Sequence, residues 1–499
     1  MPKAFHPNAL LTLRILAAAL TGAVSFADAS ASELSIAPET MVRIGTIDQR
    51  FMSYNIEMVE VTGGRFWRPY DSASQPQSDL FEYRPPIDLA NPRLRRLASA
   101  LAPAYLRVSG TWANATYFAD PDSASRPPAG FDGVLSRQQW RGVVDFSKAV
   151  GAQIVTSFAV SPGSRDAAGI WSPDQARRLL TYTQAIGGHI AAAEFMNEPN
   201  VAVNGRSAAS DDVASYARDF RAFATLLKES FPEILILAPG TAGEAASASE
   251  LLTSGAGSVD AISYHYYGTL SERCRGRSSP AEALSEQHLA QTDRPLAFYR
   301  SLRDIFAPGK PIWLTETAEA ACGGNRWDAT FLDTFRYLDQ LGRLAAGGVA
   351  VVMHNTLAAS DYGLLDQRTL EPRPNFWGAV LWRQLMGDVV LDPGVPAATE
   401  LRLYAHCRRG AKGGVTLLII NIGQAPHTLI LPVTAERYVL QGAHLQDKRA
   451  LLNGVPLQMG PEGDLPQIAG TQTAAGALTI APATITFLTA SEAANKACQ

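Results

Sequence analysis

The chain has 499 residues, of which 46% are hydrophobic and 18% are charged, the composition of a folded globular protein large enough for more than one domain. The formal net charge is -4, which argues against a protein whose whole surface binds nucleic acid, because such a surface needs a strong excess of lysine and arginine.

The N-terminus has the pattern of an export signal over residues 1–29. Lys3 and Arg14 precede a short apolar run, and small residues follow it, so we expect cleavage after Ala29 or Ala31. The run is too short to span a bilayer, and no later stretch offers about twenty uninterrupted apolar residues. We therefore expect a secreted or periplasmic protein that does not bind membranes.

From residue 45 to residue 386 short apolar strands alternate with amphipathic helices, the rhythm of parallel strands joined by crossover helices. Eight strands are predicted, at 51–57, 105–108, 153–159, 191–196, 234–238, 261–265, 312–315 and 349–354. Six helices are predicted, at 136–150, 173–186, 211–230, 295–306, 329–346 and 375–386, whereas the helices after the first and fifth strands are assigned by position only. Eight such strands predict an α/β fold, a closed (β/α)8 TIM barrel.

Two glutamates stand where strands of this barrel open into their loops. Glu198 follows the strand 191–196 and precedes Pro199, and Glu316 follows the strand 312–315. Catalytic groups of barrel enzymes lie at this end of the strands, and glycoside hydrolysis requires a pair of carboxyl groups. We predict Glu198 as the acid/base and Glu316 as the nucleophile. The plainer alternative is that each is an exposed acid that ends a strand.

Other polar side chains fall at the same end of the predicted barrel. They are Asn55 and Glu57 on the first strand, Arg107 and Ser109 on the second, His265 and Tyr267 at the sixth, and His354 and Asn355 at the eighth. Arg107 could place a cation beside Glu316 or form a structural ion pair elsewhere. Asn55 and Glu57 could line a sugar subsite or only satisfy loop amides.

After the barrel, residues 387–499 show alternating strands without helices, which predicts an antiparallel β-sandwich domain. The predicted strands are 400–405, 415–421, 427–431, 437–440 and 479–487. Asn453-Gly454 is typical of a tight hairpin turn. The segment 33–44 is a candidate for a further strand of this sandwich.

The four cysteines have no metal-ligand spacing, and export permits disulfides. Cys407 and Cys498 both lie in the C-terminal portion, so we prefer a bridge between them. Cys274 and Cys322 are either free thiols or a second bridge between neighbouring loops.

Several motifs carry a resemblance to a known family. They are Asn197-Glu198-Pro199-Asn200, Trp313-Leu314-Thr315-Glu316-Thr317, His265-Tyr266-Tyr267, Tyr404-Ala405-His406-Cys407 and Leu452-Asn453-Gly454-Val455-Pro456-Leu457. Together they resemble the heparanase-like enzymes of glycoside hydrolase family 79, whose retaining barrels place the acid and the nucleophile after the fourth and seventh strands. The Asn-Glu-Pro triplet is common to many barrel glycosidases, whereas the sandwich motifs look specific to this family.

The resemblance implies roles for residues around the two acids. Asn197 is expected to hold the sugar 2-hydroxyl, and His265 and Tyr267 to orient Glu316. Without the resemblance, His265 and Tyr267 could equally be core residues that cap the sixth strand. The family's pairing of two sandwich cysteines also fits Cys407 and Cys498.

The resemblance also implies a site for the carboxylate of glucuronic acid. Family members bind it with the backbone amides of a Gly-Gly turn and with a tyrosine after the eighth strand, and Gly323, Gly324 and Tyr362 match these positions. Relatives have a tyrosine before the two glycines, where this sequence has Cys322, which puts that one contact in question.

We predict a retaining endo-β-glucuronidase that cleaves β-glucuronosyl linkages in heparan sulfate and acts as a monomer. Two alternatives stay open: an exo-β-glucuronidase that releases terminal glucuronic acid, and a non-catalytic carbohydrate-binding barrel, which the presence of both acids disfavours. No cofactor or metal is expected, because two carboxyl groups suffice for the reaction.

One charged run remains, Arg273-Cys274-Arg275-Gly276-Arg277, directly after the sixth strand. Its three arginines would lie over the cleft, where they could bind the sulfate groups of heparan sulfate in bidentate fashion. The alternative is a solvated charged surface.

Overall fold

The computed structural model describes residues 33–71, 80–120, 126–202, 209–253, 255–395, 400–460 and 463–499. The predicted export signal at 1–29 lies outside these residues. Within them, no helix is both long enough and apolar enough to cross a membrane.

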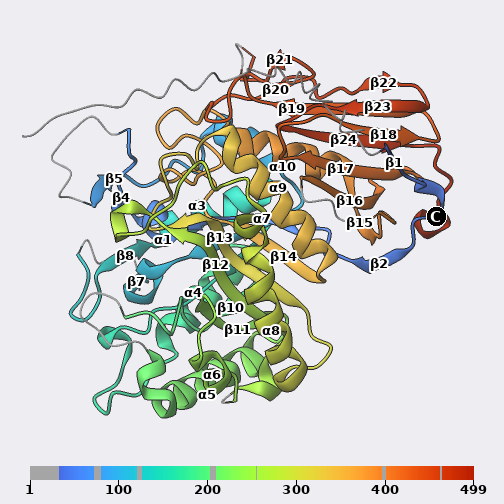
Figure 1. Cartoon of the computed structure of the whole chain (residues 1–499). Coiled ribbons are helices and arrows are strands. Elements are labelled where there is room, and N and C mark those ends of the chain that lie inside the picture. The colour runs from blue at the N-terminus through green and yellow to red at the C-terminus, as the bar shows by residue number, and fades with distance from the viewer. Residues whose placement is uncertain are drawn as a thin grey trace, which may run out of the picture.

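Eight parallel strands close into the predicted barrel (Figure 1). In order around the barrel they are β3 (Met52–Glu57), β6 (Ala104–Ser109), β9 (Ala152–Thr156), β10 (Ile190–Glu194), β11 (Leu235–Ala242), β12 (Ala261–Leu270), β13 (Ile312–Ala321) and β14 (Val349–His354). All eight predicted strands are confirmed, although their ends differ by several residues. Side chains fill the interior, for example Tyr105 and Trp313, whose rings lie 4.8 Å apart. The barrel is therefore a packed core, and a substrate reaches only the ends of its strands.

The helices pack around the barrel, and most of them bury one apolar face, whereas the helices at 331–346 and 374–385 are buried almost all round. They are α1 (Met58–Thr62), α2 (Pro92–Ser99), α3 (Arg137–Ala149), α4 (Asp174–Ala185), α5 (Val213–Ser230), α6 (Ser247–Thr253), α7 (Glu286–Leu289), α8 (Asp293–Phe306), α9 (Phe331–Ala346) and α10 (Pro374–Leu385). The six predicted helices are confirmed. Ser136 caps α3 in a reciprocal capping box with Gln139, which explains why that helix begins where the sequence predicts.

Two small sheets extend the loops at the mouth of the barrel. One is the antiparallel pair β4 (Gly64–Trp67) and β5 (Phe81–Arg84), and the other is the parallel pair β7 (Thr116–Ala119) and β8 (Gly133–Ser136). Neither pair was predicted, because these strands are four residues long and lack a clear apolar alternation.

The C-terminal part forms the predicted sandwich from a larger and a smaller sheet. The larger sheet contains β2 (Arg43–Thr46), β15 (Met386–Leu391), β16 (Leu401–Arg408), β17 (Val415–Asn421), β24 (Thr484–Ala490), β19 (Ala435–Gln441), β20 (Leu451–Leu452), β21 (Val455–Pro456) and β22 (Thr471–Thr473), and the smaller one contains β1 (Glu33–Ser35), β18 (His427–Leu431) and β23 (Gly476–Ile480). The N-terminal β1 pairs with β18, and β2 pairs with β15.

One predicted strand of the sandwich is wrong. The segment 479–487 is divided into the end of β23 and the start of β24, which belong to different sheets. Pro482 lies between them and cannot donate to a ladder, and Ala483 has a φ of +51°, outside the extended region. The Asn453-Gly454 hairpin is confirmed, since both residues have positive φ as a type I′ turn requires.

Barrel and sandwich share one hydrophobic core along the larger sheet. Leu418 and Ile420 of β17 belong to the same buried cluster as Trp377 and Trp382 of α10, and their neighbours on the opposite side of the strand pack under the smaller sheet. Figure 1 shows this sheet alongside α9 and α10. The alternating side chains of β17 are therefore buried on both faces, which fixes the sandwich against the barrel.

The structure pairs all four cysteines. The bridge Cys407–Cys498 confirms the preferred pairing, and it ties the last residues to β16. Cys274 and Cys322 form the second bridge, so neither is a free thiol.

Candidate active site

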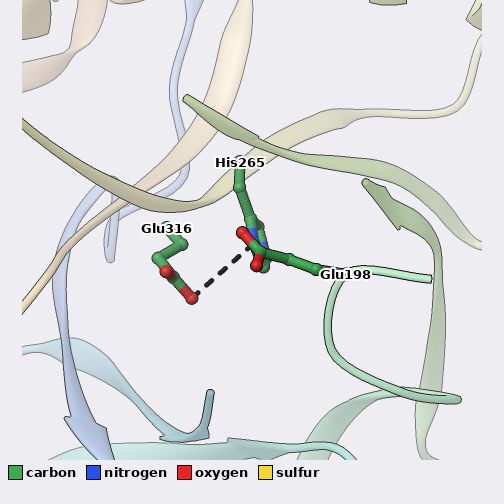
Figure 2. A group of neighbouring side chains, drawn as sticks. All are labelled: Glu198, His265 and Glu316. Carbon is green, nitrogen blue, oxygen red and sulfur yellow. Dashed lines mark hydrogen bonds and ion pairs between the residues drawn. The ribbon is translucent and has the colours of Figure 1, made fainter. Parts of the chain in front are cut away.

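The two predicted catalytic glutamates meet at the C-terminal end of the barrel. A carboxylate oxygen of Glu198, one of Glu316 and Nδ1 of His265 all lie within 4.8 Å of one another. In Figure 2 the two glutamates reach towards His265 from opposite sides. Retaining glycosidases hold their carboxyl groups roughly 5–5.5 Å apart, whereas inverting enzymes need roughly 6.5–9.5 Å for an intervening water. The observed spacing fits a double displacement.

Different local structures position the two acids. Glu316 lies within β13, whereas Glu198 lies in the loop that follows Glu194, the last residue of β10. Glu198 has a φ of +45°, an uncommon conformation for a residue with a side chain. Asn200 anchors this loop to β11 by two hydrogen bonds of 2.9 Å with the backbone of Ala242. Glu198 is 15% exposed at its side chain and Glu316 is 8% exposed.

His265 lies between the two acids on β12. Its Nδ1 is 3.0 Å from Oε1 of Glu198 and 3.6 Å from Oε2 of Glu316. Nη2 of Arg107 lies 3.2 Å from Nε2. Because a guanidinium only donates, this contact is a hydrogen bond only when Nε2 carries no proton, and the proton of the neutral ring is then on Nδ1, facing Glu198. Burial opposes a second proton on the ring, but the charge of Glu316, with a contribution from Glu198, outweighs burial and raises the pKa of His265.

Arg107 is the cation of the site, and it is 1% exposed. Its Nη1 donates to Oε2 of Glu316 at 3.0 Å, so of the two alternatives for Arg107 the cation beside Glu316 is confirmed. Nε and Nη2 donate to Oε2 of Glu194 at 3.0 and 2.8 Å, and Thr315 donates to the other oxygen of Glu194 at 2.8 Å. Burial disfavours the ionised form of Glu194, but Arg107 outweighs it and lowers the pKa of Glu194.

Sequence reasoning missed Glu194. The signal was present, because a lone charged residue in the apolar strand 191–196 is buried at a cost unless it has a partner. What the sequence could not show is that this partner is Arg107 of a different strand.

Tyr267 holds the second oxygen of Glu316. Its hydroxyl donates to Oε1 of Glu316 at 2.5 Å, and Asn355 donates to the same hydroxyl at 2.9 Å and to Oε1 of Glu57 at 3.1 Å. Burial and the charge of Glu316 raise the pKa of Tyr267 well above its usual value, so the phenol stays a donor. The same two causes raise the pKa of Glu57. Glu57 therefore keeps its proton to higher pH than an ordinary glutamate.

Asn197 is fixed at both its backbone and its side chain. Its backbone exchanges two hydrogen bonds of 2.8 Å with the side chain of Asn114, a residue that sequence reasoning did not single out. Arg107 donates to its side-chain oxygen at 2.8 Å, which leaves Nδ2 as the group able to donate to a sugar hydroxyl. Asn55 is buried and donates to the carbonyl of Thr315 at 3.1 Å, so it braces the base of the site.

Gly323 and Gly324 form a buried turn directly after β13. Their neighbours Cys322 and Tyr362 line the cleft. Nε2 of His354 donates to the carbonyl of Tyr362 at 2.7 Å, and burial lowers the pKa of His354 to about 4. His354 is therefore neutral at ordinary pH and holds the loop that carries Tyr362.

The interpretation of the run 273–277 as three exposed arginines is wrong for Arg273. Its side chain is 7% exposed, forms an ion pair with Asp361 and donates to two backbone carbonyls. Arg275 and Arg277 are exposed. Arg273 is thus unavailable to bind sulfate groups.

A cleft of about 1630 Å³ surrounds the two acids. Its lining includes the aromatic side chains of Trp67, Phe81 and Trp112, as well as Val201 and Glu244. The rings of Trp67 and Phe81 lie 4.5 Å apart, and those of Phe81 and Trp112 lie 6.3 Å apart. The cleft therefore carries a cluster of aromatic side chains in addition to the two acids.

The acids and His265 could also hold a metal ion by distance, since three ligand atoms converge there. However, Nη1 of Arg107 already places a cation 3.0 Å from Glu316. This donor set fits two carboxyl groups that act on a glycosidic bond, with Arg107 and Tyr267 as hydrogen-bond donors to Glu316.

Comparison with known proteins decides the family. The model for the N-terminal domain of glycosyl hydrolase family 79 matches residues 69–342, more than half of the chain. The chain belongs to this family. It is a heparanase-type glycoside hydrolase, which confirms the resemblance seen in the sequence motifs.

Curated relatives of this family 79 protein include a heparanase from Mus musculus, 28% identical, with 79% of this chain and 84% of the relative covered. A hyaluronoglucuronidase from Hirudo nipponia is 26% identical, with 83% and 92% covered. Heparanase-like protein 1 from Arabidopsis thaliana is 27% identical, with 78% and 74% covered.

Solved structures share the fold of this family 79 protein at low identity. A 4-O-α-L-rhamnosyl-β-D-glucuronidase from Fusarium oxysporum has a TM-score of 0.65 at 15% identity, covering 92% of this chain and 99% of that one. An α-L-arabinofuranosidase from Thermotoga maritima has a TM-score of 0.63 at 15% identity, with the same coverage. These likenesses support the arrangement of barrel and sandwich.

Proposed function

We propose that this protein is a retaining endo-β-glucuronidase that cleaves β-glucuronosyl linkages in heparan sulfate, with Glu198 as the acid/base and Glu316 as the nucleophile. The observation that carries the proposal is the approach of the two carboxylates to within 4.8 Å at the mouth of the barrel. Relatives named heparanase support the substrate class. The relative named hyaluronoglucuronidase supports glucuronic acid as the sugar that is recognised.

The reaction proceeds in two displacements at the anomeric carbon of glucuronate. Glu316 attacks this carbon while Glu198 gives its proton to the departing glycosidic oxygen, so that the C–O bond breaks and an ester to Glu316 forms. A water molecule then attacks the same carbon, Glu198 takes the water's proton, and the ester bond to Glu316 breaks. Two inversions give a product with the original β configuration.

The hydrogen-bond donors to Glu316 explain how its carboxylate is held in one orientation. Arg107 donates to one of its oxygens and Tyr267 to the other, so the carboxylate plane is fixed by two donors from different strands. Preorganised donors of this kind need no rearrangement during the reaction. Asn197, with its oxygen occupied by Arg107, offers Nδ2 to the sugar 2-hydroxyl.

The size of the cleft favours internal cleavage over release of terminal sugars. A pocket for a drug-sized ligand measures roughly 300–1,000 Å³, whereas this cleft measures about 1630 Å³. An exo-acting enzyme needs a wall directly beyond the glucuronate. Several sugars of one chain fit along this cleft, with Trp67, Phe81 and Trp112 available for stacking.

Product size separates endo from exo action. The protein is incubated with a long heparan sulfate chain, and products are followed by size-exclusion chromatography. Endo action shortens the chain early, while little free glucuronic acid appears. Free glucuronic acid with little shortening would establish the exo-β-glucuronidase instead.

The Glu316→Gln variant tests the nucleophile and the non-catalytic alternative together. Turnover should disappear while binding of an oligosaccharide persists, because the amide keeps the shape but cannot form the ester. A covalent inactivator that mimics glucuronate should label Glu316, as mapped by peptide mass spectrometry. Full hydrolysis by Glu316→Gln, or labelling of another residue, contradicts the assignment.

We also propose that the protein is exported and acts as a monomer. The export pattern at 1–29 and two disulfides support this location, since disulfides persist in oxidising compartments. Proteomic detection of the mature N-terminus after Ala29 or Ala31 outside the cytoplasm tests it, and an intact Met1 in the cytoplasm would contradict it.

A further inference from the structure

The turn Cys322-Gly323-Gly324 has a backbone that few residues adopt. Its φ angles are +63°, +83° and +88° in succession. A Cβ atom on Gly323 would lie 2.4 Å from Cβ of Trp67, and one on Gly324 would lie 2.9 Å from the backbone nitrogen of Tyr362. Both positions therefore require glycine, and Cys322 must be held in the left-handed region by its surroundings.

All three carbonyls of this turn accept hydrogen bonds from the protein. Nη1 of Arg273 donates to the carbonyls of Cys322 and Gly324, at 3.1 and 2.9 Å. The carbonyl of Gly323 accepts from Oγ of Ser360 at 2.8 Å and from the amide of Asp361 at 3.0 Å. The direction of each peptide plane in the turn is thereby fixed.

Fixed carbonyls also fix the amides that follow them. In a planar trans peptide the C=O of one residue and the N–H of the next point in opposite directions. Since Arg273 holds the carbonyl of Cys322, the amide of Gly323 faces away from Arg273, and the amide of Gly324 likewise faces away from Ser360. Across the described chain, no protein acceptor takes a hydrogen bond from either amide.

Arg273 is itself immobilised from three sides. It forms an ion pair with Asp361, and its guanidinium carbon lies 3.8 Å from the ring centroid of Tyr70. The backbone of Tyr70 donates to the same carboxylate at 3.2 Å. The next residue, Cys274, is joined to Cys322 by a disulfide. The loop that carries Arg273 and Cys274 is therefore attached to the turn in two ways, by the disulfide and by the hydrogen bonds from the Arg273 guanidinium.

We propose that Arg273 and the Cys274–Cys322 disulfide are positioning groups that aim the amides of Gly323 and Gly324 at the carboxylate of the substrate's glucuronic acid. The inference rests on the proposed function. Cys322 stands where relatives have a tyrosine. In this inference it contributes to substrate recognition by holding the turn through its disulfide, and not by contact with the substrate. Arg273 acts through the backbone and does not touch the substrate.

The test compares a substrate that has the carboxylate with one that lacks it, an aryl β-glucuronide and the matching aryl β-glucoside. Arg273→Met removes both hydrogen bonds to the turn and should raise KM for the glucuronide by about ten- to a hundredfold, with a smaller fall in kcat. The glucoside should change by less than about threefold, because the amides recognise a group that it lacks. Arg326→Met is the matched control, since Arg326 lies over the same Tyr70 ring, at 4.3 Å, and donates to no carbonyl of the turn.

A second pair of variants tests the role of the Cys274–Cys322 disulfide. Replacing Cys274 and Cys322 together by serine should reduce the preference for the glucuronide, as should mild reduction of the wild type. Replacing Cys407 and Cys498 together should leave that preference unchanged, because their bridge lies in the sandwich. If Arg273→Met does not fold, as judged by circular dichroism, Arg273→Lys and the cysteine variants are measured instead, with a smaller loss expected for lysine.

The outcomes separate this inference from the proposed function. Equal losses on both substrates, or equal effects of the Arg273 and Arg326 variants, would overturn the positioning role. A wild-type protein that hydrolyses no glucuronide would overturn the proposed function itself. As a readout independent of turnover, labelling by a glucuronate-type inactivator should slow in Arg273→Met, while labelling by its uncharged analogue should not.

Discussion

Substitution of Arg107 by methionine is expected to destabilise the fold and to abolish activity. The guanidinium is 1% exposed and donates to Glu194 through two nitrogens and to Glu316 through the third. Methionine fills part of the space but leaves two buried carboxylates without their cation. The variant tests whether the charges at the base of the site are balanced by this one residue.

The expected loss can be worked out in two ways. Hydrogen bonds to charged groups contribute about 1.5–3 kcal/mol each, and Arg107 serves two carboxylates, which gives roughly 3–6 kcal/mol. Removal of one partner from a buried ion pair costs roughly 3–5 kcal/mol by itself. We therefore expect the free energy of unfolding to fall by about 3–5 kcal/mol for Arg107→Met, as measured by urea denaturation at neutral pH.

A double-mutant cycle with Glu194 checks the cause. Glu194→Gln should destabilise by itself, because Arg107 loses one acceptor charge. The double variant Arg107→Met/Glu194→Gln should lose less free energy of unfolding than the sum of the losses in the two single variants. The difference, which is the coupling energy, should be about 1.5–3 kcal/mol. Strict additivity, or a loss below about 1 kcal/mol in Arg107→Met, would refute this explanation.

The same pair predicts a dependence on pH. The pKa of Glu194 is lowered in the fold from its ordinary value of 4.5, so the stability that ionised Glu194 contributes is present above pH 4.5. It is lost as the pH falls through the lowered pKa. In the wild type, stability should drop with acid in this range, and in Glu194→Gln this part of the drop should be absent.

Three further predictions concern neighbouring groups. The pKa of Glu57 is raised above 4.5 in the fold, so Glu57 ionises at lower pH in the unfolded chain than in the folded one. The free energy of unfolding of the wild type should therefore fall as the pH rises above 4.5. It should fall less in Glu57→Gln, as measured by denaturation at a series of pH values. Trp112→Ala should lower kcat/KM about three- to tenfold on the polymer but hardly on an aryl glucuronide, whereas equal loss on both would contradict a stacking role. Among the described residues lining the cleft, acidic side chains outnumber the two arginines, Arg65 and Arg165. At low salt an unsulfated chain should therefore be cleaved faster than a highly sulfated one, because the acidic side chains repel sulfate groups. Faster cleavage of the highly sulfated chain would contradict this prediction.

The barrel could be predicted because its strands and helices carry their signal locally. Continuous apolar runs mark buried parallel strands, and the order of the strands places Glu198 and Glu316 at one end. The ladder between β12 and β13 extends beyond both predicted strand ends, to Leu270 and Ala321. That extension depends on pairing between distant segments, which no local pattern reveals.

The side-chain partners within the site could be predicted only in part. A position near Glu316 was one of two alternatives for Arg107, and its contacts to Glu194 and Asn197 depend on how β6 lies against β10 and the loop that follows it. Arg273 was misjudged for a related reason. In the sequence it belongs to a charged run, which is usually exposed, whereas its actual partners include the turn after β13 and Asp361, far along the chain.

The charges around His265 suit a reaction in which negative charge moves from one glutamate to the other. In the proposed scheme Glu316 loses its charge when the ester forms, and Glu198 gains one at the same moment, because it has given its proton to the leaving oxygen. Nδ1 of His265 lies 3.0 Å from Glu198 and 3.6 Å from Glu316, so the ring faces one carboxylate charge before this step and one after it. Arg107 meanwhile stays paired with Glu194, whose charge does not change. The net charge of the buried cluster is therefore constant through the first displacement, and its surroundings need little rearrangement to stabilise the transition state.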